Sequence, residues 1–333
     1  MNILMTVKKE LFPKIFDQAA RSKLESLGIV TYRFDLDRNS SQEEYSLALK
    51  ESATEVVVTG WDSPFLSYQT YSENPQLKYL CHVAGEVRPY VDNKVIEAGL
   101  IVSNWGDSVA KGVAEGTLMM ILAALRRATF HQVEMHVRKG WGREAAPEGL
   151  FYQRVGLLGL GAIAREVVNL LKPFQCQVYA YDPFLSDEVF STLDVVQLKS
   201  VQSLFETCRI ISIHVSKLDE NYHIVNRDIL SRLEDGGLII NLARGSIIDT
   251  EALIAELKSG RIHAALDVFE AEPLDENSAL RGLENCLLIP HQAGPTPDRW
   301  IDMGNLTVEN IENYIAGRDI KYVVTPEKFK LMT

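Results

Sequence analysis

The stretch Val155-Gly-Leu-Leu-Gly-Leu-Gly-Ala-Ile-Ala164 decides how this chain folds, because it joins an apolar strand, a glycine turn and the start of a helix. Gly159 permits a tight turn, and Gly161 lets the backbone approach a pyrophosphate at the helix N-terminus. Ala164 stands where a third glycine is usual, and its small methyl group is accepted at this contact between helix and strand. The order strand, turn and helix predicts a dinucleotide-binding βαβ unit.

The next predicted strand, QVYAYD, ends in an acid placed where dinucleotide-binding folds contact the ribose. This acid, Asp182, lies about twenty residues beyond the turn, where a carboxylate accepts hydrogen bonds from the adenosine ribose hydroxyls. Its charge repels a 2′-phosphate, so the motif favours NAD over NADP. The alternative is a glycine-rich βα turn whose acid merely caps a loop.

Short β-rich runs alternate with helical patterns along the chain, which predicts parallel sheets built from βαβ units. A first series of predicted strands covers residues 2–7, 29–34, 55–59, 77–83 and 100–104. A second series covers residues 154–161, 176–182, 209–215, 237–243, 263–269 and 286–291. Helical patterns occupy residues 8–27, a largely apolar stretch at 108–128 and a segment that begins at Thr296. The fold class is therefore α/β, with two doubly wound parallel-sheet domains.

Composition excludes several classes of protein. A chain of 333 residues, 46% hydrophobic and 24% charged, is typical of a globular protein with more than one core. The net charge of −11 and the lack of a Lys/Arg run argue against nucleic-acid binding, and no apolar stretch is long enough to span a membrane. The N-terminus lacks the pattern of a secretory signal, and the four cysteines form no CxxC pair or zinc-like cluster. We therefore expect free thiols, no metal site and a cytoplasmic location.

Two polar side chains follow apolar strands of the second series. Arg244, in Ile240-Asn-Leu-Ala-Arg-Gly-Ser246, carries a planar guanidinium suited to bidentate capture of a carboxylate. His291, in Leu287-Leu-Ile-Pro-His-Gln-Ala-Gly294, places an imidazole rigidly at a strand end, and imidazole exchanges protons near neutrality. The alternatives are a surface arginine in a turn and a structural histidine.

Three carboxylates follow another strand in the stretch ALDVFEAEPL, residues 265–274, namely Asp267, Glu270 and Glu272. A carboxylate beside His291 would orient the ring and stabilise the imidazolium, but sequence spacing alone leaves open which acid reaches it. In the first series, the turn at residues 82–85 can aim backbone N–H groups at an anion, and an ordinary turn is the alternative.

Together the segments VGLLGLGAIA, YDP, IISIHVSKLDE, LIINLARGSIIDTEAL, HAALDVFEAEPL and IPHQAGPT resemble the D-isomer-specific 2-hydroxyacid dehydrogenase family, in the family's order, over residues 75–315. The resemblance implies a flavodoxin-like substrate domain, residues 1–104 with 297–333, into which a Rossmann NAD-binding domain, residues 105–296, is inserted. It also implies an NAD(H)-dependent oxidoreductase that interconverts a small 2-keto acid and a D-2-hydroxy acid, usually as a homodimer.

The resemblance also implies roles for individual residues. Arg244 matches the substrate-binding arginine, His291 the general acid/base, and Glu272 the partner of that histidine. Asp267 matches the acid that contacts the nicotinamide carboxamide, whereas Glu270 has no fixed role and is expected to be solvated. Backbone amides of the loop Val83, Ala84 and Gly85 match those that bind the substrate carboxylate. The implied cofactor-binding positions are Gly159, Gly161, Ala162, Ile163, Asp182, Pro183, His214, Val215, Ser216, Leu242, Ala243, Arg244, Asp267, His291 and Gly294.

The chain departs from the family pattern at Ser216, where the family usually has a proline near the cofactor. Its first hundred residues match only loosely, and there Trp61 and Asp62 are candidates to line the substrate pocket, or else are exposed loop residues. Two other functions share the fold and motifs: an NAD-binding corepressor-like regulator, and a formate or phosphonate dehydrogenase. The pairing of Glu272 with His291 argues against a formate dehydrogenase, which needs no proton transfer to the substrate carbon.

Overall fold

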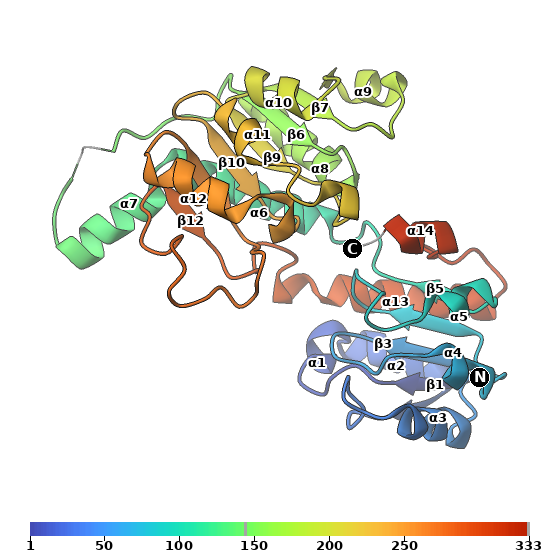
Figure 1. The fold of residues 1–333 in the computed structure, drawn as a ribbon. Helices are drawn as coiled ribbons and strands as arrows, with labels where there is room; N and C mark the ends of the chain where they lie inside the picture. The colour runs from blue at the N-terminus through green and yellow to red at the C-terminus, as the bar shows by residue number, and fades with distance from the viewer. Residues whose placement is uncertain (143–144, 332–333) are drawn as a thin grey trace. The chain divides into compact units, whose positions relative to one another are not determined.

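The computed structural model describes residues 1–142 and 145–331 and divides into two compact units (Figure 1). Unit 1 comprises Met1–Val109 and Thr296–Thr333, and unit 2 comprises Ala110–Pro295. Unit 2 thus covers nearly the same chain as the expected cofactor domain, residues 105–296. The chain enters unit 2 once and returns to unit 1 for its last helices.

Unit 1 is built on a five-stranded, all-parallel sheet in the order β2-β1-β3-β4-β5. This is the flavodoxin-like order, in which the topological switch point lies between β1 and β3. Because every strand is parallel, all five end at one edge, which we call the carboxyl edge. The strands are β1 (Asn2–Met5), β2 (Ile29–Tyr32), β3 (Val56–Thr59), β4 (Tyr79–His82) and β5 (Ile101–Ser103).

Alternate side chains of these strands enter two separate cores, as the period of two in a strand requires. Ile3 and Met5 of β1 lie in one core and Leu4 in the other. The first core is covered by α1 (Phe12–Ile15), α2 (Gln18–Leu27) and α13 (Ile301–Ile315). The second is covered by α3 (Gln42–Glu51), α4 (Tyr68–Ser72), α5 (Asn93–Glu97) and α14 (Pro326–Leu331).

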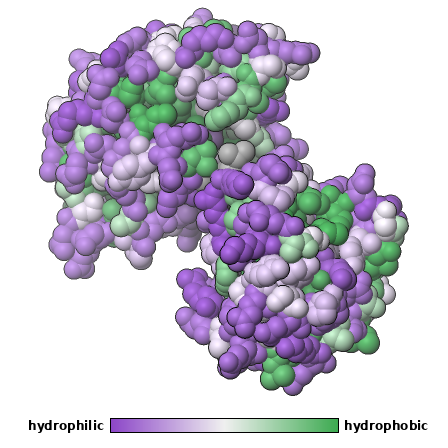
Figure 2. All heavy atoms as spheres, turned by 45° about the vertical axis from the view of Figure 1, so that its right-hand side comes forward, coloured by the Kyte–Doolittle hydropathy of each residue, from purple (hydrophilic) through white to green (hydrophobic). Residues whose placement is uncertain are grey.

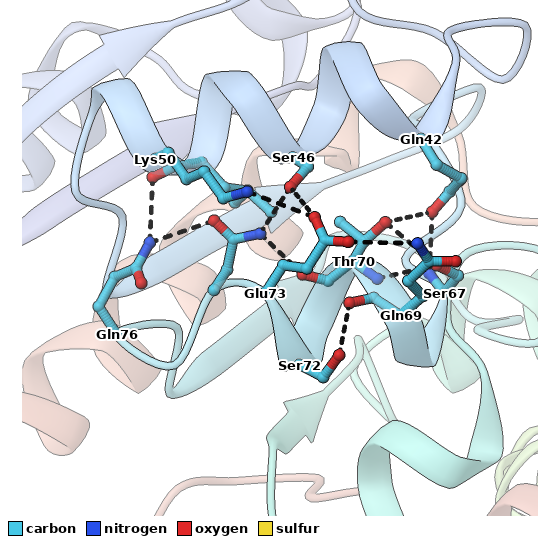
Figure 3. A network of polar contacts seen from close by, with 11 residues as sticks. Gln42, Ser46, Lys50, Ser67, Gln69, Thr70, Ser72, Glu73 and Gln76 are labelled. Carbon is cyan, nitrogen blue, oxygen red and sulfur yellow. Dashed lines mark hydrogen bonds and ion pairs between the residues drawn. The ribbon is translucent and has the colours of Figure 1, made fainter.

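The single helical stretch expected over residues 8–27 is wrong, because the structure divides it into α1 and α2. Phe16 adopts an extended conformation between them, and Asp17 caps α2 by accepting a hydrogen bond from Ala20 N–H. On the other face of the sheet, α3 and α4 are joined by a polar network (Figure 3). In it Glu73 accepts from Ser46 at 3.0 Å and from Lys50 at 3.3 Å.

Unit 2 contains a seven-stranded parallel sheet in the order β12-β11-β10-β9-β6-β7-β8. Counted from β6 this is 3-2-1-4-5-6-7, a Rossmann order, with its switch point between β6 and β9. Its two-residue strand β8 was not among the strands predicted from the sequence. The strands are β6 (Arg154–Leu158), β7 (Gln177–Tyr181), β8 (Val196–Gln197), β9 (Ile210–Ile213), β10 (Leu238–Asn241), β11 (His263–Leu266) and β12 (Cys286–Leu288).

Helices cover both faces of this sheet as well. One core includes residues of α6 (Ala110–Leu125), α8 (Ala162–Leu171) and α9 (Asp187–Leu193). The other includes residues of α10 (Val201–Thr207), α11 (Arg227–Ser231) and α12 (Thr250–Lys258). The apolar helix expected at 108–128 ends at Leu125, and α7 (Ala128–Gln132) continues into a π-helix, Val133–Arg138. Short 3₁₀ turns of unit 2 lie at Lys172–Phe174, Asp219–Asn221 and Gly245–Ile247, and one of unit 1 lies at Pro297–Arg299.

The visible faces of both units are mainly hydrophilic, with scattered apolar patches (Figure 2). Within the described ranges no helix has the length and apolar character needed to cross a membrane. All four cysteines are free thiols.

Candidate active site

The glycine turn of unit 2 lies at the switch point of its sheet. Gly159 has φ of +90°, a conformation that favours glycine, and a Cβ there would come within 3.0 Å of the backbone of His214. The loop after β6 therefore packs directly against the loop after β9. Both the backbone angle and this contact require the absence of a side chain.

The N-terminus of α8 is open toward the carboxyl edge of the unit 2 sheet, the edge at which its seven parallel strands end. Gly161 is its N-cap, and a Cβ on Gly161 would meet no protein atom within 4 Å. Among the hydrogen bonds of the described residues, none uses the N–H of Gly161, Ala162 or Ile163. Unpaired N–H groups and the positive end of the helix dipole favour an anion. These residues fit the pyrophosphate of a dinucleotide.

Asp182 holds the glycine turn in place. One oxygen of its carboxylate accepts from Leu160 N–H at 3.0 Å, and the other accepts from Phe184 N–H at 3.0 Å, beyond Pro183. The capping role considered as an alternative is thus present. Each carboxylate oxygen has a second lone pair, so these bonds are compatible with acceptance from ribose hydroxyls.

The loop after β9 carries His214, Val215 and Ser216. Desolvation lowers the pKa of His214 to about 4, so its ring is neutral near pH 7, and Nε2 contacts Ser212 Oγ at 2.9 Å. The carbonyl of Ser216 accepts from Leu218 N–H and from the Asn221 side chain, which fixes the start of this loop.

Asn241 shapes the loop that carries Arg244, a role the sequence analysis missed. Its buried side chain accepts from Ala243 N–H at 3.0 Å and donates to Arg244 O at 2.9 Å. The available signal was a polar residue inside the apolar run LIINLA. The Arg244 guanidinium donates to Ala243 O at 2.7 Å, and no carboxylate in the described parts of the chain forms an ion pair with it. Its charge is therefore available to an anionic ligand.

Asp267 closes β11 and anchors the loop after β12. It is 2% exposed, and one oxygen accepts from Gln292 N–H at 2.7 Å and Ala293 N–H at 2.9 Å. Burial raises the pKa of its carboxyl group, whereas the two N–H donors and His291 oppose that shift. In the backbone, Asp267 O accepts from His291 N–H at 2.8 Å. Asp267 thus fixes the segment from His291 to Gly294 relative to the sheet.

His291 and Glu272 are in direct contact. His291 Nδ1 lies 2.7 Å from Glu272 Oε2, and the other carboxylate oxygen accepts from Phe269 N–H at 3.0 Å. Across the described ranges, His291 Nε2 takes part in no hydrogen bond. The contact expected between these two residues is present, and it leaves Nε2 as the nitrogen free to exchange a proton.

Gly245 brings the Arg244 loop against the turn that carries Glu272. A Cβ on Gly245 would lie 1.9 Å from the carbonyl carbon of Phe269, so the two backbones touch. Glycine is required here by close approach of the backbone. Arg244, Glu272 and His291 are thereby grouped at the carboxyl edge of unit 2.

Glu270 is exposed, as expected, and it also has partners that the sequence did not indicate. One oxygen of its carboxylate accepts from Tyr222 Oη at 3.2 Å and contacts His223 Nε2 at 3.0 Å. The other oxygen accepts from Thr250 Oγ1 at 3.1 Å. Glu270 joins three segments that are distant in sequence, and a strand-end pattern contains no signal for such partners.

In unit 1, the loop after β4 carries Val83, Ala84 and Gly85. Val83 N–H donates to Thr59 O at 2.8 Å, whereas the N–H groups of Ala84 and Gly85 make no hydrogen bond among the described residues. A Cβ on Gly85 would lie 2.4 Å from Trp105 Nε1. The indole therefore packs on the loop and leaves two amides unpaired.

No group of three or more His, Cys, Asp or Glu side chains that could hold a metal ion occurs in residues 1–142 and 145–331.

Comparison with known proteins identifies the family. Residues 118–293 match the sequence model of the D-isomer specific 2-hydroxyacid dehydrogenase, NAD binding domain. A D-3-phosphoglycerate dehydrogenase of Methanocaldococcus jannaschii is 33% identical over 249 residues, 73% of this chain and 47% of that protein. A glyoxylate reductase of Thermofilum pendens is 33% identical over 241 residues, 70% of each chain. The chain belongs to the D-isomer specific 2-hydroxyacid dehydrogenase family, whose cofactor is NAD.

The solved structure of D-2-hydroxyisocaproate dehydrogenase shares the fold, with a TM-score of 0.81 and 22% identity over 97% of this chain and 99% of that one. The chain spans about half the length of the phosphoglycerate dehydrogenases that it matches, 47% and 46% of two archaeal examples.

Proposed function

We propose that this protein is an NAD-dependent D-2-hydroxyacid dehydrogenase that interconverts a 2-keto acid and a D-2-hydroxy acid. The observation that carries the proposal is the 2.7 Å contact between His291 Nδ1 and Glu272 Oε2, which leaves Nε2 free at the carboxyl edge of unit 2. Relatives named glyoxylate reductase and hydroxypyruvate reductase, 33% and 35% identical, support this class of reaction.

NADH, when bound, supplies the hydride that reduces the carbonyl carbon of the substrate. Its pyrophosphate is proposed to bind at Gly161, Ala162 and Ile163, and its adenosine ribose at Asp182. Asp267 is proposed to bind the nicotinamide carboxamide. The remaining proposed contacts come from Gly159, Pro183, His214, Val215, Ser216, Leu242, Ala243, Arg244, His291 and Gly294.

His291 serves as the general acid in the reductive direction. As imidazolium it donates the Nε2 proton to the carbonyl oxygen, and as neutral imidazole it accepts the hydroxyl proton in the reverse direction. Glu272 stabilises the imidazolium and holds the ring by its bond at Nδ1, as an acid does in an Asp–His pair.

Arg244 is proposed to bind the substrate and to stabilise negative charge that develops on its oxygen. A guanidinium without a carboxylate partner in the described part of the chain suits this role. The unpaired amides of Ala84 and Gly85, with Val83, are proposed to bind the substrate carboxylate in unit 1. An ordered set of donors lowers the barrier by holding the substrate in the reactive orientation.

A homodimer in a reducing compartment such as the cytoplasm is also proposed. Four free cysteines suit such a compartment. Val137 and Trp141, 72% and 71% exposed, leave apolar surface on unit 2 that a second copy would cover.

Oxidation of NADH in the presence of single 2-keto acids tests the proposed reaction. Glyoxylate, hydroxypyruvate, pyruvate, phenylpyruvate and longer branched acids form the panel, and at least one is expected to be turned over. Tight NADH binding without turnover of any 2-keto acid would overturn the proposal and favour the regulator.

A further inference from the structure

We propose that the carboxyl edge of unit 1 contains a cationic subsite, formed by Lys8, Arg38 and Asp62, that selects 2-keto acids with a second anionic group. This inference rests on the proposed function and concerns which substrates it accepts. It arises from ion pairs that join loops far apart in the sequence.

The parallel sheet places these residues side by side. Arg38 follows β2, Lys8 follows β1 and Asp62 follows β3, and the loop with the unpaired amides follows β4. Since the strand order is β2-β1-β3-β4, their loops are neighbours along one edge. The loops after β1, β3 and β4 meet at Gly60, because a Cβ there would lie 3.1 Å from Val83 and 3.3 Å from Val7.

The three charges do not balance. Asp62 forms ion pairs with both Lys8 and Arg38. Among the described side chains neither cation has a second carboxylate partner, so one carboxylate serves two positive charges. The side chains of Lys8 and Arg38 are 43% and 67% exposed, whereas that of Asp62 is 18% exposed. Because Asp62 is largely buried and the two cations are accessible, the excess positive charge is available to a ligand.

The residues around Asp62 hold it in place, and on one side they keep water from screening its charge. Its N–H donates to Tyr90 Oη at 3.4 Å, and its backbone has φ of +69°. Beside it, Trp61 packs against Trp105 and Trp300, with ring centroids 5.8 and 5.4 Å away. An apolar wall of this kind strengthens nearby electrostatic interactions. Burial, with a smaller effect from Glu86, raises the pKa of Tyr90, and among the described residues Glu86 forms no ion pair with either cation.

The two sets of donors in neighbouring loops define the class of substrate. The Lys8 ammonium contacts Asp62 in the loop after β3, and the amides of Ala84 and Gly85 lie in the neighbouring loop after β4. Both sets of donors therefore lie in loops at the carboxyl edge of the same sheet. A short carbon chain with an acidic group at each end would present one anion to the cations and the other to the amides. The subsite therefore suits a 2-keto acid with a terminal carboxylate, phosphate or sulfonate.

The test is a comparison of kcat/KM for matched pairs of substrates. Oxaloacetate, 2-oxoglutarate and phosphohydroxypyruvate carry the second anion, whereas pyruvate, 2-oxobutyrate and hydroxypyruvate lack it. We expect the double variant Lys8→Met/Arg38→Gln to lower the ratio of dianionic to monoanionic kcat/KM by about 10- to 100-fold, the effect of losing charge-assisted hydrogen bonds. Most of this loss should appear in KM, and added salt should reduce the ratio for the unaltered enzyme.

Lys9→Met is the matched control, because Lys9 is an exposed neighbour with no ion pair among the described residues. Thermal unfolding and NADH binding check that the double variant folds. If monoanionic acids are turned over and the ratio is unchanged in the double variant, the subsite is disproved while the proposed reaction stands. If no 2-keto acid of either kind is turned over, the proposed reaction itself fails.

Discussion

The carboxyl edges of the two units differ in how their acids are held. In unit 2, Asp182, Asp267 and Glu272 each accept hydrogen bonds from backbone N–H groups, at distances between 2.7 and 3.0 Å. Their positions are therefore fixed by the fold itself. In unit 1 the corresponding acid, Asp62, is paired instead with the ends of two long side chains.

This difference follows from what each unit is proposed to bind. A cofactor has one shape, and backbone bonds hold its binding groups at fixed positions at little cost in side-chain entropy. Long cationic side chains can be substituted by mutation without a change in the backbone. A site made from them can therefore change its substrate specificity while the fold stays the same. Unit 2 accordingly carries the recognisable motifs, and unit 1 carries few.

The largest expected effect comes from His291→Gln in unit 2. Loss of the acid/base group should lower kcat by about 10²- to 10⁴-fold, while NADH binding persists. Single-turnover kinetics and nicotinamide fluorescence measure the two quantities. His136→Gln, an exposed histidine of the same unit, serves as the control. Retention of normal turnover in His291→Gln would exclude His291 as the source of the proton.

Glu272→Gln should have the next largest effect. Without the charge and the firm bond at Nδ1 the ring is less well held for proton transfer, so turnover should fall by about 10-fold or more and its pH profile should change. Glu270→Gln is the matched control, because Glu270 contacts Tyr222, His223 and Thr250 but not His291. A shift in the Glu270 variant alone would reverse the assignment of the two acids.

Asp182→Ala should weaken NAD binding by about 10-fold, the effect of one or two hydrogen bonds to a charged group, and should relax discrimination against NADP. Titration with both cofactors measures this. Asp182→Asn keeps an acceptor oxygen for the backbone of the glycine turn, so it should retain more affinity than the alanine variant. Equal NAD affinity in all three proteins would disprove the ribose contact.

The smallest expected effect concerns stability and compares the two units directly. Burial lowers the pKa of His82 in unit 1 to about 3, and desolvation lowers that of His214 in unit 2 to about 4. Both are neutral in the folded state, whereas in the unfolded chain they take up protons below about pH 6.5. Their contribution to stability is thus present above pH 6.5 and is lost as the pH falls toward 4 and 3.

Urea unfolding between pH 7 and pH 5 measures this loss. Each histidine contributes a slope of at most about 1.4 kcal/mol per pH unit. His82→Gln should remove one such contribution, and His214→Gln the other. An unchanged slope in either variant would show that its histidine already takes up a proton in the folded state.

The sequence alone predicted the α/β class and nearly all strands, because strand periodicity and glycine turns are local properties of the chain. Residues 155–164 also predicted the strand, glycine turn and helix found there, since these are contiguous in the sequence. The helix over residues 8–27 was wrong because the capping side chain of Asp17 interrupts a continuous helical pattern.

What sequence by itself determined was the set of chemical groups that follow each strand: Arg244, His291, the three acids of residues 265–274 and the turn at 82–85. Only the tertiary structure decided which groups meet. It paired Glu272 with His291, gave Glu270 three other partners, and joined Lys8 and Arg38 to Asp62. The physical reason is that parallel strands bring loops distant in sequence to one edge, and the spacing along the chain does not encode which side chains then lie within hydrogen-bonding distance.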